Sequence, residues 1–169
     1  MIDAELARAN AVRALQSLRI EHDPILQRWS DLSIGEPAAV CDVAGPPSYW
    51  LAPFVKEGRV IGFVRIGADG GTMAVGVTCR TPDNIAACPA LVTGISGEEA
   101  SARVRSEVAL VEGEALSTPR FVHDGPPGRE AWLVESRVGA RPHRWFFVSQ
   151  AGVYQRPAGV RIGEDAGRE

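Results

Sequence analysis

Two pairs of adjacent residues carry the side chains best suited to acid–base or nucleophilic chemistry. Cys41-Asp42 and His123-Asp124 each stand just ahead of a Gly-Pro-Pro turn. An imidazole, a thiol and carboxylates are the groups that general acid–base and covalent catalysis use. If these two segments lie close together, the four residues form a candidate catalytic set.

A structural interpretation of the same four residues competes with the catalytic one, and we favour it. Neighbouring residues of a strand point to opposite faces, so His123 and Asp124 cannot share a pocket if the strand continues through them. Asp42 and Asp124 would then hold the turns that follow them by bonding to the backbone, which aspartate does well. Cys41 would be a small core residue.

A run of three aromatic residues, Trp145-Phe146-Phe147, is the candidate binding site. In a strand, such a run places at least one side chain on each face of the sheet. An uncovered face would be an apolar patch of the kind that marks a partner or ligand surface. The alternative is that the other half of the chain packs over this face and buries it.

Several function classes are excluded by composition and by missing motifs. The chain of 169 residues has a net charge of -3, so it lacks the basic field that nucleic-acid binding needs. No apolar run approaches the roughly 18 residues that cross a bilayer. There is no zinc spacing of Cys or His and no glycine-rich phosphate loop. We therefore expect no metal, no cofactor, no nucleic acid and no membrane span.

The three cysteines, Cys41, Cys79 and Cys88, are an odd number in a chain large enough to fold without crosslinks. The N-terminus has acidic residues ahead of its arginines, unlike a secretory signal. Both features predict reduced thiols and a cytoplasmic protein. A Cys79–Cys88 disulfide is the alternative, and it needs an oxidising compartment.

Hydrophobic periodicity divides the chain into helices followed by short strands. Residues 4–20 have a helical period behind Asp3 as N-cap, Pro24–Leu32 indicates a second short helix, and Ser96 with Glu99 forms a capping box for a helix ending near Gly113. Four strand-like runs follow in each half of the chain. We divide the chain into a first unit (1–80), a linker (81–95), a second unit (96–156) and a polar tail (157–169).

The two halves align without gaps when the chain is shifted by 82 residues. The shift matches Trp50 with Trp132 and Phe63 with Trp145. The predicted fold class is therefore α+β, a pseudo-twofold tandem repeat of two similar halves. Each half is a helix packed on a roughly four-stranded antiparallel sheet.

In each half, an aromatic-led strand, an apolar strand and a reverse turn resemble PepSY-like and cystatin-like propeptide modules. The residues that carry the resemblance are Trp50, Leu51, Phe63, Ile66, Asp69 and Gly70, and Trp132, Leu133, Phe147, Val148, Gln150 and Gly152. The resemblance implies a non-catalytic module that binds a protein partner and inhibits or chaperones a peptidase.

A double hot-dog fold has a similar order of elements and leads to the alternative function. It would make the chain a small-molecule-binding or acid–base enzyme with a pocket between its halves, built from Cys41, Asp42, His123 and Asp124. The expected partner is a protein or peptide on the first interpretation and an apolar small molecule on the second. An uncovered edge strand could also pair with another chain, so a homo-oligomer is a further expectation.

Overall fold

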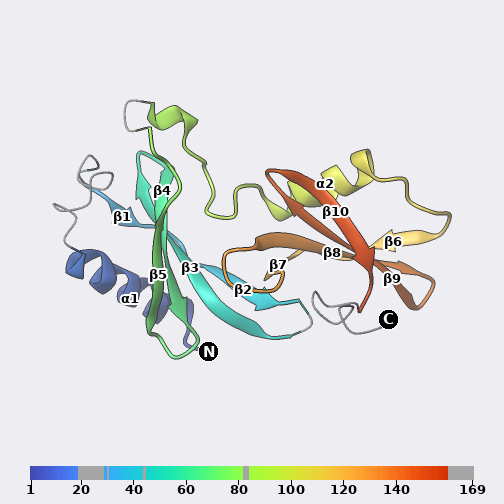
Figure 1. The fold of residues 1–169 in the computed structure, drawn as a ribbon, viewed down its shortest axis with the longest axis horizontal. Helices are drawn as coiled ribbons and strands as arrows, with labels where there is room; N and C mark the ends of the chain where they lie inside the picture. Colours follow the sequence, from blue (N-terminus) through green and yellow to red (C-terminus); the bar gives the residue numbers. More distant parts are fainter. Residues whose placement is uncertain (19–28, 30, 44, 82–83, 160–169) are drawn as a thin grey trace, which may run out of the picture. The chain divides into compact units, whose positions relative to one another are not determined.

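The computed structural model describes residues 1–18, 29, 31–43, 45–81 and 84–159, which belong to two compact units (Figure 1). Unit 1 comprises Met1–Val40 and Pro47–Gly94, and unit 2 comprises Cys41–Pro46 and Ile95–Glu169. The segment predicted as a linker, 81–95, falls almost wholly in unit 1 and includes a short 3-10 helix, η3 (Ile85–Ala87).

Unit 1 packs one α-helix on an antiparallel sheet. Its elements are α1 (Ala4–Ser17), β1 (Ser33–Ile34), most of β2 (Ala38–Asp42), β3 (Pro47–Lys56), β4 (Arg59–Gly67) and β5 (Thr72–Val77). Helix α1 begins as predicted, because Asp3 Oδ1 accepts a hydrogen bond from the backbone N–H of Leu6 at 2.8 Å. Ala7, Ala11 and Ala14 are its buried residues, and their small side chains let the helix approach the sheet closely.

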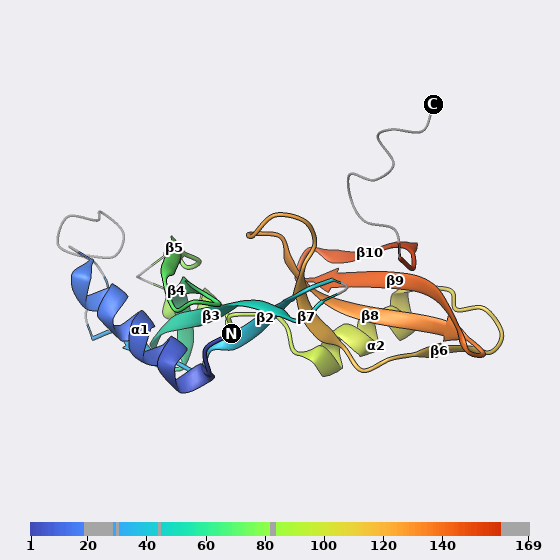
Figure 2. The same cartoon turned by 90° about the horizontal axis from the view of Figure 1, so that it is seen from below.

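Unit 2 has a comparable order of elements. It contains α2 (Gly97–Glu107), β6 (Glu114–Leu116), β7 (Arg120–His123), β8 (Glu130–Val138), β9 (Arg141–Ser149) and β10 (Gly152–Pro157). Figure 2 shows α2 along one side of β8 and β9, and its Ala100 and Val104 pack there against Phe146.

Helix α2 begins where the sequence predicts and ends earlier. Ser96 Oγ accepts a hydrogen bond from the backbone N–H of Glu99 at 3.0 Å, which confirms the predicted cap. The helix ends at Glu107, because Val108 is already extended and Gly113 adopts a positive φ of 76° in a turn. The second helix predicted at Pro24–Leu32 lies largely outside the described residues.

Each α-helix is tied to its sheet by a tryptophan on the neighbouring strand. Trp50 Nε1 donates to the carbonyl oxygen of Ile2 at 3.1 Å. Trp132 Nε1 donates to the carbonyl oxygen of Ile95 at 2.9 Å. Ile2 and Ile95 each precede the N-cap residue of a helix, so both hydrogen bonds position a helix start over a strand.

The predicted fold class of two halves, each a helix on its own sheet of about four antiparallel strands, is wrong. The described strands form one ten-stranded sheet in the order β10-β9-β8-β7-β2-β3-β4-β5, with β1 on β3 and β6 on β8. The sheet is mixed because β2 and β7 are parallel, with Cys41 opposite Val122 and Asp42 opposite His123. Strands of two or three residues show no period, and no turn marks a parallel pair whose members lie far apart in the chain.

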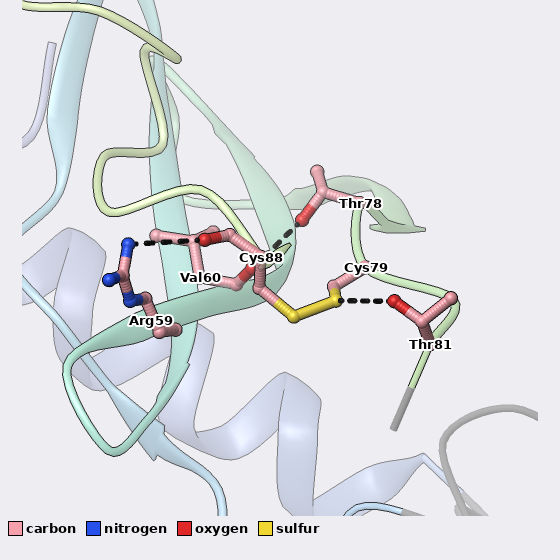
Figure 3. Close-up of a disulfide and its surroundings, with 6 residues drawn as sticks. All are labelled: Arg59, Val60, Thr78, Cys79, Thr81 and Cys88. Atoms are coloured by element: carbon pink, nitrogen blue, oxygen red, sulfur yellow. Dashed lines mark hydrogen bonds between the residues drawn. A yellow bond between two sulfur atoms is a disulfide. The ribbon is translucent and has the colours of Figure 1, made fainter. Parts of the chain in front are cut away.

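The expectation of three reduced thiols is also wrong. Cys79 and Cys88 form a disulfide (Figure 3), with a Cα–Cα distance of 5.3 Å. Cys41 is the free cysteine. The bond closes a loop onto β4, where the Val60 N–H donates to the carbonyl of Pro89 at 2.8 Å. The sequence spacing permitted this bond, but only the approach of the two Cα atoms decides it.

None of the helices in the described ranges is both long and apolar enough to cross a bilayer.

The connection from α2 to β6 is held by an ion pair between Glu114 and Arg144. Arg144 Nε donates to Glu114 Oε1 at 3.0 Å, and its Nη2 donates to Oε2. Glu114 Oε2 also accepts the backbone N–H of Val111 at 2.9 Å, and the Glu114 side chain is buried. The hydrogen bonds from Arg144, more than any other group, lower the pKa of Glu114 from 4.5 to about 2.

This lowered pKa predicts a pH-dependent contribution to stability. The ionised Glu114 stabilises the fold fully above pH 4.5, and this contribution is lost as the pH falls towards about 2. Glu114→Gln should therefore lower the free energy of unfolding by about 2–3 kcal/mol near neutral pH and by little near the folded pKa. Urea unfolding across this pH range measures it. Glu112→Gln, at an exposed position of the same connection, is the control; an equal loss at all pH values would contradict the prediction.

Candidate functional site

The structure brings together only some of the predicted catalytic residues. Asp42 and His123 are direct partners in the parallel pair of β2 and β7, and partners in a ladder point to the same face. Cys41, one residue earlier, points to the other face and packs against the apolar cluster that includes Val122 and Leu133. The Cys41 thiol and the His123 imidazole are therefore on opposite sides of the sheet and do not form a thiol–imidazole pair.

The imidazole of His123 bonds back to its own turn. Its Nδ1 lies 2.6 Å from the carbonyl oxygen of Gly125, and a carbonyl can only accept. Nδ1 therefore carries a proton, and in the neutral ring Nε2 is the basic nitrogen. This contact fixes the ring at the β7–β8 turn, a role that the structural interpretation had given to Asp124 and not to His123.

Asp124 is fully buried. Its Oδ2 accepts a hydrogen bond from the Tyr154 hydroxyl at 2.6 Å, and its Oδ1 lies 2.7 Å from Arg156 Nη2 in an ion pair that is not aligned as a hydrogen bond. Burial, together with this bond to Asp124, raises the pKa of Tyr154, which stays protonated as the donor. The carboxylate therefore holds β10 in place and does not face an open site.

Two aromatic rings complete the surroundings of Arg156. Its guanidinium lies 4.5 Å from the ring centroid of Phe147 and 5.5 Å from that of Trp145. The Phe147 ring also stacks on Tyr154, with centroids 4.9 Å apart. Arg156 Nε and Nη1 are buried without a hydrogen-bond partner in the described ranges, and the π faces take the place of one.

The predicted aromatic binding run is buried on both faces of the sheet. The exposed fraction is 7% for Trp145 and 0% for both Phe146 and Phe147. Trp145 and Phe147 lie under Arg156, and Phe146 lies against α2. These side chains do not form an exposed apolar patch, and their role in binding stays an untested prediction.

A cleft of about 360 Å³ in unit 2 is lined by charged residues that neutralise each other. Arg120 Nη2 donates to Glu135 Oε1 at 3.1 Å and to the carbonyl of Val43 at 2.9 Å, so both charges at the cleft wall are paired. The rest of the cleft is lined by Gly45, Pro142, Trp145, Ala158 and Gly159. No group of His, Cys, Asp or Glu in the described part of the chain could hold a metal ion.

The two end strands of the sheet differ in how they are protected. An end strand presents unpaired N–H and C=O groups, which proteins usually guard with charges or proline. Strand β10 carries Arg156 and Pro157, the first of which joins the Asp124 network. Strand β5, with the sequence TMAVGV, has neither a charge nor a proline, and among the described strands it pairs only with β4. The β5 edge therefore lacks the charge and the proline that β10 carries, although its pairing with β4 shifts register opposite Thr72–Ala74.

The two faces of β5 are unlike each other. Val75 and Val77 pack into the core beneath α1, whereas Ala74 and Gly76 point the other way. A side chain at Gly76 would meet the Phe63 ring at 2.5 Å, so glycine lets that ring lie close to the strand. Met73 is 50% exposed. The sequence signal for this edge was a six-residue run without charge, but periodicity does not say which strand ends a sheet.

The Asp124 network predicts a difference between the two aspartates that precede the Gly-Pro-Pro turns. Asp124→Asn keeps an acceptor for Tyr154 but leaves Arg156 without its counter-charge, which should lower the free energy of unfolding by about 3 kcal/mol. Asp42→Asn, at a half-buried position, should cost about 1 kcal/mol or less. Chemical denaturation of both variants measures the difference.

The outcome has a clear alternative. If Asp124→Asn is as mild as Asp42→Asn, the buried ion pair does not hold β10. In a double-mutant cycle with Arg156→Gln, the two costs should not add, because the pair is already broken by either change.

No family model, curated protein or solved structure matches this chain, so the resemblance to PepSY-like modules stays a prediction and function must be argued from the geometry.

Proposed function

We propose that this chain is a non-catalytic binding module that holds an extended segment of a protein partner along the β5 edge. The observation that carries the proposal is the unprotected edge itself, with its uncharged sequence and its pairing on one side to β4. A strand added to such an edge gains main-chain hydrogen bonds, and its alternate side chains contact the two faces of the sheet.

The site geometry favours binding over catalysis. Cys41 faces away from His123, and the Asp124 carboxylate is buried in contacts with Tyr154 and Arg156. Nucleophilic catalysis by a thiol needs a base within hydrogen-bond reach, and the Cys41 thiol and the His123 imidazole lie on opposite faces. The resemblance to peptidase-restraining modules makes a peptidase one partner class for such an edge.

The proposal predicts that peptides bind at β5 and nowhere else in the described sheet. Octapeptides selected from a random display library on the folded chain should slow hydrogen exchange of the Thr72–Val77 amides. Ala74→Lys adds a charge in the middle of the edge and should weaken binding by about tenfold or more, because the ammonium would be desolvated by the added strand.

A matched control separates edge blocking from general charge effects. Ala151→Lys makes the same change at an exposed turn between β9 and β10 and should leave binding unchanged. Selected peptides that protect other amides, or that bind Ala74→Lys as well as the unmodified chain, would overturn the proposal.

We further propose that the chain works in an oxidising compartment, in place of the cytoplasm expected from composition. The Cys79–Cys88 bond supports this, because structural disulfides persist where thiols are not kept reduced. Alkylation of the protein isolated from its native source, followed by mass spectrometry, should find Cys41 modified and the other two cysteines protected. Three alkylated thiols would restore the cytoplasmic expectation.

A further inference from the structure

The β5 edge has an exposed arginine at its first end, on helix α1. Arg13 and Thr72, the first residue of β5, line the same cleft of about 340 Å³, together with Asn10 and Gly70. Arg13 Nη2 donates to Asn10 Oδ1 at 2.8 Å, and none of the described carboxylates pairs with its guanidinium. Asp69, in the nearby turn, instead accepts the backbone N–H of Gly71 at 2.9 Å.

A second exposed arginine follows the other end of the strand. Arg80 comes three residues after Val77, and the chain leading to it is fixed. The N–H groups of Thr78 and Cys79 both donate to the carbonyl of Ile61, at 2.9 Å and 3.0 Å, and the disulfide holds Cys79. No carboxylate in the described ranges pairs with Arg80.

These two arginines determine which charges a segment bound at the β5 edge should carry. Six residues of strand span roughly 20 Å, so an added strand along Thr72–Val77 would run from the end that lies beside Arg13 to Val77, three residues before Arg80. Because an exposed arginine lies towards each end of an uncharged strand, a segment with carboxylates at both ends can pair with them in either direction.

The same charges disfavour a second copy of this chain as the occupant. If two β5 strands paired antiparallel, the Thr72 end of one would lie beside the Val77 end of the other. Arg13 of one copy would then face Arg80 of its partner copy without a carboxylate between them, which is repulsive.

We infer that the partner segment is extended and acidic, with an uncharged core of about six residues between aspartate or glutamate side chains. This inference rests on the proposed function of the β5 edge and names the chemistry of its partner. Arg13 and Arg80 are the residues that recognise the flanking carboxylates, and β5 supplies the main-chain hydrogen bonds.

The test uses three acetylated and amidated peptides that share one alternating threonine–valine core and differ in their flanks. The flanks are glutamate, glutamine or lysine, and fluorescence anisotropy measures the dissociation constant of each. Exposed ion pairs contribute little each, so the glutamate peptide should bind only about fivefold more tightly than the glutamine peptide. The advantage should shrink between about 0.05 M and about 0.5 M salt.

Arginine variants assign this preference to its residues. Arg13→Gln and Arg80→Gln should each reduce the advantage of the glutamate peptide about twofold, and leave the glutamine peptide unaffected. Arg105→Gln, at an exposed position on α2, should change neither affinity. Circular dichroism checks that the variants fold.

The possible failures are distinguishable. If the glutamate and glutamine peptides bind equally while the β5 amides are protected, the acidic partner is wrong and the strand-binding function stands. If none of the three peptides, nor any selected octapeptide, protects β5, the proposed function fails as well. If β5 is protected by self-association of the chain at rising concentration, the occupant is a second copy and the inference is overturned.

Discussion

The need of every backbone N–H and C=O for a partner governs this molecule more than any single side-chain contact. Inside the sheet, each strand forms backbone hydrogen bonds with the strands on both sides. Trp50 and Trp132 add side-chain hydrogen bonds that position the helix starts over the strands. An open sheet cannot satisfy its two end strands in this way. The two end strands, β10 and β5, differ in this respect: β10 is held by side-chain contacts, and β5 is the candidate binding edge.

At the β10 end of the sheet, a buried ion pair between Asp124 and Arg156 holds the last strand in place. Asp124 is desolvated completely, a cost that its contacts with Arg156 and Tyr154 offset. The rings of Trp145 and Phe147 lie against the Arg156 guanidinium. At the other end, β5 has a glycine and uncharged side chains, and its charges stand beyond the strand at Arg13 and Arg80. Strand β10 thus carries a charged residue within the strand, whereas the nearby arginines of β5 lie outside it.

Much of the secondary structure follows from local rules, and the sheet topology does not. The caps at Asp3 and Ser96 were predictable because each side chain bonds to a backbone N–H three residues away. The long strands were predictable from alternation and from the turns between them. The parallel pairing of Cys41 with Val122 was not, because residues so far apart leave no local trace of contact. The disulfide depended on the same kind of distant approach.

The sequence by itself determined the helix starts, the long strands, the turn positions and the residue types available for chemistry, since these depend on neighbours within a few places. It also predicted that His123 and Asp124 point to opposite faces if the strand continues through them, but β7 ends at His123. Only the tertiary structure decided that the aromatic run is buried, that Asp124 is used in an ion pair, and that β5 ends the sheet. Burial, ion pairing and edge position are relations between distant segments, and no period of two or 3.6 residues encodes them.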